Sequence, residues 1–240
     1  MDITNKRVLI TGASSGIGRA LGISLGRFGC KVAACARNKK SLENTASQHP
    51  HIKPYRADIT KRDDRLNLYK QIKRDMDGID VLVNNAGRMV LFDSVVEIPD
   101  TIENEIDLNF SAPVELIRLF LPQLLKAPES AIINVTSGLA LWPNKSAPVY
   151  CASKAALHSF TKSLRWQLEK TTVRVIEVLP PLVQTPSATK KGGISPNLFA
   201  KRVVEEIKKG ISEIKLEEVK LLAIGRHISP FVTDAFMKNK

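Results

Sequence analysis

The sequence predicts a single α/β domain with a doubly wound, mostly parallel sheet of seven strands and helices on both faces. Short apolar runs alternate with longer amphipathic segments along most of the 240 residues, and no linker interrupts them. This alternation is typical of βα units that build one sheet. Several apolar runs contain almost no polar residue, which is expected of strands that are covered on both faces.

Six strands are expected before residue 180, at 7–10, 31–36, 52–55, 79–83, 131–135 and 173–179. Helices are expected between them, near 16–29, 40–47, 61–76, 100–126 and 147–170. Right-handed crossovers would place these helices on the two faces of the sheet.

The alternation ends after residue 179. Residues 180–199 contain four prolines and a Gly-Gly pair, which favours a loop. Loops of this length are often functional, so we expect a substrate lid at 186–210, with a helix at about 199–209 inside it. Residues 211–240 are expected to add the seventh strand, at about 213–223, and a short terminal helix. Residues 1–240 would then form one domain.

Composition excludes several classes of protein. With 43% hydrophobic and 25% charged residues the chain can form a core, and no apolar run approaches the roughly 18 residues needed to span a membrane. Three cysteines and four histidines without ligand spacing predict neither a disulfide framework nor a metal site. The first residues carry no apolar segment, so we expect no secretory signal and a cytoplasmic protein.

The net charge of +12 could indicate a nucleic-acid partner. However, residues 190–240 hold only +5 of it, with 11 basic and 6 acidic residues, so the excess is spread along the chain. We therefore expect neither a nucleic acid nor a membrane as partner. Salt-dependent DNA binding would test this.

A strand leads into a glycine-rich turn and then a helix near the start of the chain. Residues 8–18 read Val-Leu-Ile-Thr-Gly-Ala-Ser-Ser-Gly-Ile-Gly. The first glycine permits a tight turn, the second lets backbone N–H groups approach a pyrophosphate, and the third allows the helix to pack closely on the strand. The helix N-terminus then faces the anion with unpaired donors. The expected dinucleotide contacts are Gly12, Ser14, Ser15, Gly16, Ile17 and Gly18.

Further motifs follow this turn in a recognisable order. Residues 84–87 read Asn-Asn-Ala-Gly, and a Tyr150-x-x-x-Lys154 pair lies thirteen residues after Ser137. With the Gly-x-x-x-Gly-x-Gly turn, these motifs make residues 6 to about 186 resemble the standard-length branch of the short-chain dehydrogenase/reductase family. The resemblance implies a Rossmann-like fold and a nicotinamide cofactor. It places Asn84 as the cap of the fourth strand beside the cofactor. It also implies cofactor contacts at Asp58, Asn85, Ala86, Gly87, Tyr150, Lys154, Val183 and Thr185.

The residues after the second strand predict which nicotinamide cofactor binds. An acidic residue at this place would bind the ribose 2′-hydroxyl of NAD, but the sequence has Ala36 followed by Arg37. A guanidinium suits a 2′-phosphate, with which it forms paired charge-assisted hydrogen bonds. We therefore expect NADP, with NAD as the alternative; Arg37 could instead be a simple surface charge.

Tyr150 and Lys154 are the expected centre of catalysis. They lie four residues apart in a predicted helix and therefore share one face. Lowering a phenol pKa from near 10 to roughly 7 requires about 4 kcal/mol, which one cation at about 4 Å supplies in an effective dielectric of about 20. The family resemblance implies that Tyr150 exchanges a proton with the substrate oxygen, that Lys154 lowers the pKa of Tyr150 and binds ribose hydroxyls, and that Ser137 stabilises the substrate oxygen. It further implies that Asn109 supports a proton relay through water.

Residues 180–185, Pro-Pro-Leu-Val-Gln-Thr, resemble the family's Pro-Gly-x-Val-x-Thr segment. Pro181 replaces the usual glycine, which fixes φ and removes an N–H, so the path of the loop could differ locally. Cys151 and His158 lie beside the Tyr-Lys pair, and we interpret both as structural rather than catalytic.

The substrate is less defined. Apolar residues near the expected site favour a small apolar ketone, aldehyde or secondary alcohol, and they are Met89, Leu91, Leu139, Leu141 and Trp142. Trp142 and Met89 could equally pack in the core. Two rival functions are a catalytically silent NAD(P)-binding regulatory protein and a sugar-nucleotide epimerase or dehydratase, although the latter usually has a larger substrate domain.

The C-terminal segment departs from the commonest family pattern. Residues 215–225 lack the glycine-rich ending that helps to assemble tetramers. With residues 180–183 they are similar to a bacterial branch named after lipoteichoic-acid alanylation operons. A homo-oligomer, dimer or tetramer, is expected, with a monomer as the alternative.

Overall fold

The structure is a computed structural model that describes residues 1–186, 192–216 and 219–220. The strands are β1 (Arg7–Thr11), β2 (Lys31–Ala36), β3 (Ile52–Arg56), β4 (Val81–Asn84), β5 (Ser130–Val135), β6 (Val173–Leu179) and β7 (Glu213–Lys215). The helices are α1 (Gly16–Arg27), α2 (Lys39–Ala46), α3 (Arg62–Met76), α4 (Ile102–Ile106), α5 (Ala112–Leu124), α6 (Pro148–Gln167) and α7 (Pro196–Lys208). A π-helical turn, η1 (Asp107–Ser111), and a 3-10 turn, η2 (Gly138–Ala140), complete the assignment.

The seven strands form one sheet in the order β3-β2-β1-β4-β5-β6-β7, and every neighbouring pair is parallel. The predicted fold class is therefore confirmed. The chain winds outward from β1 to β3, and then from β4 to β7 in the opposite direction. Because the direction reverses between β1 and β4, their carboxyl ends open a crevice, where ligands of such sheets bind.

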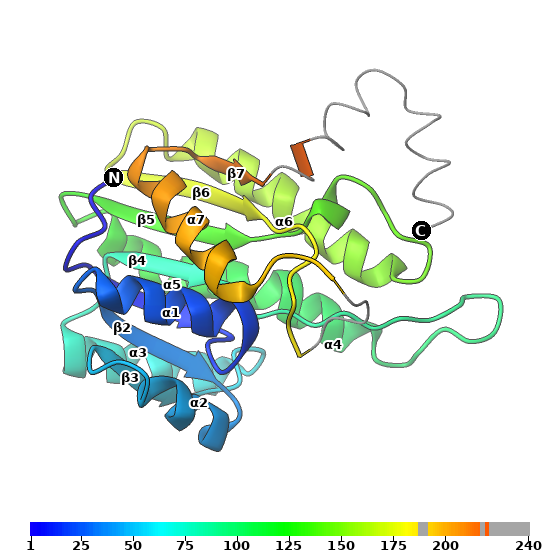
Figure 1. Cartoon of the computed structure of the whole chain (residues 1–240), viewed down its shortest axis with the longest axis horizontal. Coiled ribbons are helices and arrows are strands. Elements are labelled where there is room, and N and C mark those ends of the chain that lie inside the picture. The colour runs from blue at the N-terminus through cyan, green and yellow to red at the C-terminus, as the bar shows by residue number, and fades with distance from the viewer. Residues whose placement is uncertain (187–191, 217–218, 221–240) are drawn as a thin grey trace.

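Helices cover both faces of the sheet (Figure 1), and an apolar layer lies between the sheet and the helices on each face. On β1, Val8 and Ile10 face the layer that includes α1 and α7, whereas Leu9 faces the layer that includes α3 and α5. This alternation follows from the two-residue period of a strand. Since both faces are covered, central strands such as β5 are buried at every position.

The observed structure differs from the prediction at two elements. The helix expected over 100–126 is instead α4, the π-helical turn η1 and α5. Pro113 has no N–H to donate to the carbonyl of Asn109, so a regular α-helical ladder is not available at this point. The strand expected at 213–223 is shorter, because β7 ends at Lys215 and residues 219–220 are helical. The terminal helix lies outside the described residues.

The expected lid, residues 186–210, includes α7. One face of this helix is buried in the core, with Phe199 and Val203 fully inaccessible to solvent. Residues 187–191 lie outside the described part of the chain. Within it, no helix combines the length and the hydropathy that a membrane crossing needs.

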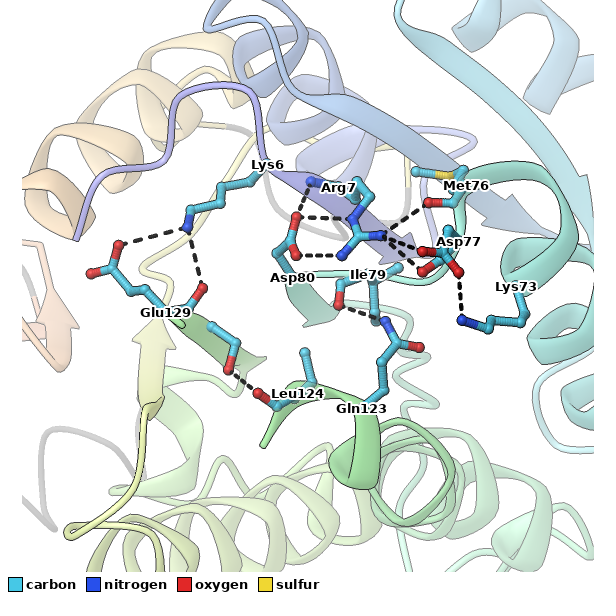
Figure 2. Close-up of polar contacts among 11 residues, drawn as sticks. Lys6, Arg7, Lys73, Met76, Asp77, Ile79, Asp80, Gln123, Leu124 and Glu129 are labelled. Atoms are coloured by element: carbon cyan, nitrogen blue, oxygen red, sulfur yellow. Dashed lines mark hydrogen bonds and ion pairs between the residues drawn. The ribbon is translucent and has the colours of Figure 1, made fainter. Parts of the chain in front are cut away.

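Polar contacts tie the amino ends of the central strands together (Figure 2). The Arg7 guanidinium donates to Asp80 at 2.7 Å and to the backbone carbonyl of Asp77 at 2.8 Å. Gln123 on α5 donates to the carbonyl of Ile79 at 2.8 Å. Although burial raises the pKa of Asp80, hydrogen bonds from Arg7 outweigh this effect and leave it below its usual value. These contacts hold the amino ends of the strands together, while the loops at the carboxyl ends form the site.

Candidate active site

A cavity of about 750 Å³ lies at the carboxyl ends of the central strands. This volume is within the usual range for small-molecule and cofactor sites. Most of the residues expected from the sequence line it, and these are Gly12, Ser14, Ser15, Gly16, Ile17, Arg37, Asp58, Asn85, Ala86, Gly87, Ser137, Tyr150, Lys154, Val183 and Thr185. Gly18 and Asn109 do not line it and lie behind its wall.

The glycine turn has the conformation that a phosphate-binding turn needs. Gly12 and Gly16 have positive φ values of 66° and 53°, which other residues rarely adopt. A Cβ on Gly18 would overlap the Gly12 carbonyl oxygen and the Asn85 amide, so only glycine lets α1 pack this closely. Ser15 is the N-cap of α1 and forms no capping hydrogen bond with its side chain. The first N–H groups of α1, which have no intrahelical acceptors, therefore face the cavity.

The strand ends at the switch point are held by a threonine that sequence reasoning missed. The Thr11 hydroxyl accepts hydrogen bonds from the backbone N–H groups of Asn85 and Ala86, at 3.0 and 3.1 Å. The Asn85 amide donates back to the Thr11 carbonyl at 2.9 Å. Asn84 was expected beside the cofactor, but its side chain donates to Asn134 in the interior at 2.9 Å. Asn85 is the asparagine that reaches the cavity.

Ser137, Tyr150 and Lys154 meet in the cavity from two elements. Ser137 lies two residues after the end of β5, and the other two side chains come from α6. Lys154 is only 3% exposed, and its ammonium donates to the carbonyl of Val135 at 2.9 Å. This ammonium lies 5.9 Å from the centre of the Tyr150 ring. The hydrogen bond to β5 thus positions the lysine beside the phenol.

Burial opposes charge on both groups. Burial raises the pKa of Tyr150 to about 12, although a hydrogen bond with Ser137 acts in the opposite direction. Burial also lowers the pKa of Lys154 from 10.5 to about 8. The sequence argument expected a phenol near 7. The protein alone gives the opposite shift, since the desolvation of Tyr150 is larger than the effect of Ser137.

Asn109 lies in η1 and is fully buried. Its amide accepts from the N–H of Arg88 at 2.9 Å and donates to the Arg88 carbonyl at 2.8 Å and to the Ser153 hydroxyl at 3.0 Å. One side chain therefore holds both the segment after Gly87 and the helix that carries Tyr150. A π-helical turn inside a helix often marks a functional site.

The part of the cavity lined by Arg37 and Asp58, after β2 and β3, contains basic side chains that are exposed to solvent. Arg37 is 68% exposed and lies 3.9 Å from Asp58. Arg56, which sequence reasoning missed, donates to the Arg37 carbonyl at 3.2 Å. Burial raises the pKa of Asp58, but hydrogen bonds from Thr60 and the charge of Arg37 bring it below its usual value. Asp58 is therefore an anion that already has a partner.

Only some of the apolar residues that were expected near the substrate line the cavity. Met89, Leu91 and Leu139 line the cavity, whereas Leu141 does not. Trp142 is only 3% exposed and does not line the cavity either, so it belongs to the core. Its position after η2 turns the indole inward, a detail that the sequence pattern does not contain.

His158 has the structural role expected for it. Its ring nitrogen lies 2.9 Å from the carboxylate of Glu177, which is 1% exposed. Glu177 also accepts from the Thr136 hydroxyl at 2.6 Å. The hydrogen bond with Glu177 raises the pKa of His158. This network supports β5 just before Ser137, and it joins residues too far apart in sequence for a motif to reveal.

Comparisons with known proteins agree on one family. The model of the family described as short chain dehydrogenase matches residues 6–193. The uncharacterized oxidoreductase DltE of Bacillus subtilis (strain 168) is 43% identical over 229 residues, which cover 91% of each chain. An uncharacterized oxidoreductase of Staphylococcus aureus (strain MRSA252) is 33% identical, with 76% of this chain and 80% of that protein covered.

Solved structures show the same fold. A short chain dehydrogenase from Burkholderia cenocepacia J2315 in complex with NADP superimposes with a TM-score of 0.87 at 28% identity, over 99% of both chains. The 3-ketoacyl-(acyl-carrier-protein) reductase from Brucella melitensis, complexed with NADH, gives a TM-score of 0.83 at 23% identity, over 90% of this chain and 98% of the reductase.

Proposed function

The chain belongs to the short-chain dehydrogenase family of oxidoreductases, and on this basis we propose that it transfers a hydride between NADP(H) and a small carbonyl compound or secondary alcohol, with Tyr150 as the general acid and base. The observation that carries the proposal is the convergence of Ser137, Tyr150 and Lys154 on the cavity that the glycine turn also lines. Acid–base, oxyanion and phosphate-binding groups thus face one space.

The residues present fit a dinucleotide. The tight glycine turn and the free N–H groups of α1 suit the pyrophosphate, and Thr185 lies against Gly16, where an added Cβ would meet its methyl carbon at 2.9 Å. Lys154 would hold the nicotinamide ribose beside Tyr150. The bound nicotinamide supplies or accepts the hydride and, in its oxidised form, adds a positive charge near the phenol.

During reduction, Tyr150 would donate its proton to the substrate oxygen while Ser137 donates a hydrogen bond to the same atom. Both donors stabilise the negative charge that develops on this oxygen. Lys154 remains fixed by Val135 and favours the phenolate that results. Asn109 acts as a positioning residue, because it holds α6 through Ser153 and the cavity wall through Arg88.

The preference for NADP rests on the basic end of the cavity. Arg37 is exposed there, Arg56 lies beside it, and Ala36 provides no carboxylate for a ribose hydroxyl. A 2′-phosphate would be attracted by both guanidinium groups. The relative from Burkholderia cenocepacia, 28% identical, was crystallised with NADP. Fluorescence titration of the enzyme with NADPH and with NADH tests this preference, and tighter binding of NADH would refute it.

The test of the reaction is Tyr150→Phe, with Tyr69→Phe as the matched control. Tyr69 packs against Phe120, remote from the cavity lining, so its change should leave the rate intact. A set of small ketones and aldehydes is incubated with NADPH, and the loss of its absorbance is followed. Tyr150→Phe should lose roughly 100-fold or more in turnover and retain NADPH binding. Near-normal turnover in Tyr150→Phe would refute the assignment.

A further inference from the structure

This inference builds on the proposed function and concerns the class of substrate. We propose that the carbonyl substrate carries an anionic group of the carboxylate or phosphate type, which Arg88 binds at the wall of the cavity. The juxtaposition that points to it is an exposed arginine, without a hydrogen-bond or ion-pair partner among the described residues, next to the glycine that lies against the lysine of the site.

The position of Arg88 is fixed by its neighbours. A Cβ on Gly87 would lie 3.3 Å from the Lys154 ammonium, so Gly87 lies directly against this lysine. The next residue, Arg88, has both its N–H and its carbonyl held by the buried amide of Asn109. Its backbone therefore cannot shift without breaking two hydrogen bonds, and its side chain starts from a defined point on the cavity wall.

The guanidinium of Arg88 forms neither an ion pair nor a hydrogen bond with any residue that the structure describes, although Arg88 is exposed and lines the cavity. The other charged side chains in the lining are engaged: Arg37 faces Asp58, and Lys154 donates to a backbone carbonyl. Arg88 is thus the free cation of this wall in the described part of the chain.

Glu105, whose carboxylate interacts with the charge of Arg88, does not take the place of an anionic ligand. Glu105 is 2% exposed, and it accepts the N–H of Val90 at 3.2 Å instead of pairing with Arg88. Burial raises the pKa of Glu105, while the hydrogen bond from Val90 and the charge of Arg88 act in the opposite direction. A carboxylate held behind the wall therefore leaves the guanidinium open to an anion inside the cavity.

The remainder of the substrate side is mostly apolar, with Asn144 and Ser146 as polar lining residues. The apolar lining residues are Met89, Leu91, Leu108, Leu139, Leu182 and Val219. A ligand that matches this surface has an apolar body, a carbonyl that reaches Tyr150, and one anionic end. A guanidinium binds the oxygens of a carboxylate or a phosphate through two parallel hydrogen bonds, which a neutral ketone cannot offer.

The kinetic test uses pairs of substrates that differ only in charge. One pair is an aliphatic oxo acid and its amide, and the other is dihydroxyacetone phosphate and dihydroxyacetone. We expect the wild-type enzyme to favour the anionic member of one pair roughly tenfold to a hundredfold in kcat/KM. Arg88→Met should remove this preference by raising the KM for the anionic substrate. It should catalyse the reduction of the neutral substrate as fast as the wild type does. Arg27→Gln, which alters an exposed arginine at the end of α1, should keep the preference.

A binding measurement separates this inference from the proposed function. Hexanoate and hexanamide are titrated calorimetrically into the enzyme loaded with NADPH, which requires no turnover. Hexanoate should bind roughly tenfold or more weakly to Arg88→Met than to wild type, and hexanamide equally to both. The inference is wrong, and the proposed function stands, if the enzyme reduces neutral carbonyls but shows two further results. These are that the charge of the substrate and the change of Arg88 leave kcat/KM unaltered, and that hexanoate binds equally to wild type and Arg88→Met. If no carbonyl is reduced while hexanoate binding depends on Arg88, the anion site stands and the proposed reaction fails.

Discussion

Replacing Lys154 by methionine should stabilise the enzyme while it abolishes activity. Burial lowers the pKa of this lysine from 10.5 to about 8, which corresponds to a cost of about 3 kcal/mol for holding the charged form in the folded protein. Methionine has a similar length and no charge. Its cost is the hydrogen bond to Val135, about 1 kcal/mol. The variant should therefore gain about 2 kcal/mol at neutral pH, or about 4–8 °C in Tm for a chain of this size.

The gain should depend on pH with a defined sign. Below about pH 8 both the folded and the unfolded wild type carry the charged lysine, so the full cost is present. Between this value and 10.5 the unfolded chain binds more protons than the folded one, and a rising pH therefore stabilises the wild type. The advantage of Lys154→Met should shrink over this interval and become, above it, a deficit of about 1 kcal/mol from the lost hydrogen bond to Val135.

Thermal unfolding followed by circular dichroism, on the enzyme without cofactor at neutral and at alkaline pH, measures this difference. Lys126→Met, which alters an exposed lysine after α5, is the control and should show no comparable gain. Turnover of NADPH by Lys154→Met should fall at least roughly 100-fold. A variant that is less stable than wild type at neutral pH, or one whose gain is the same at alkaline pH, would refute the electrostatic argument.

Three further predictions concern the support of the site. Gly18→Ala should destabilise the protein by about 1–3 kcal/mol in urea unfolding, because its Cβ would overlap the Gly12 carbonyl; Gly22→Ala, whose Cβ finds no atom closer than 3.8 Å, should not. Asn109→Ala should cost about 3 kcal/mol in the same assay, since three hydrogen bonds are lost. His158→Gln should cost about 2 kcal/mol at about pH 6. Since the folded pKa of His158 is raised, this cost should be full below 6.5 and decrease as pH rises through the folded pKa; a cost that grows with pH would contradict it.

The sequence was sufficient to predict the fold because its signals are local and repeated. An apolar run such as 173–179 is long enough for one strand, and the amphipathic segment after each run determines the crossover. The interruption at Asn109 and the early end of β7 were missed for a physical reason. The last strand depends on pairing with β6, and periodicity in a single segment carries no information on that pairing. The π-helical turn depends on Pro113, whose missing N–H the apolar periodicity does not record.

The same distinction applies to the site. Glycines and the Tyr150–Lys154 pair are visible in sequence because their spacing alone places them on one turn or one helix face. Thr11 and Glu177 were not visible, since each acts through a partner that is remote in the chain, and Arg88 belongs to no motif. For Thr11, a polar residue at the end of an otherwise apolar strand was a signal that could have been used.

Tyr150 shows how sequence and structure together constrain the chemistry. Spacing predicts that Lys154 favours the phenolate, but burial raises the pKa of Tyr150 to about 12 and lowers that of Lys154. The protein by itself therefore keeps the phenol protonated, which is the form that a proton donor needs for carbonyl reduction. For the reverse reaction the phenolate must form, and one cation 5.9 Å from the ring centre does not outweigh the burial. The positive charge of an oxidised nicotinamide next to the ring would then provide the remaining stabilisation. In the proposed mechanism, the protein alone therefore prepares Tyr150 to donate a proton, and phenolate formation would depend on the charge of the bound cofactor.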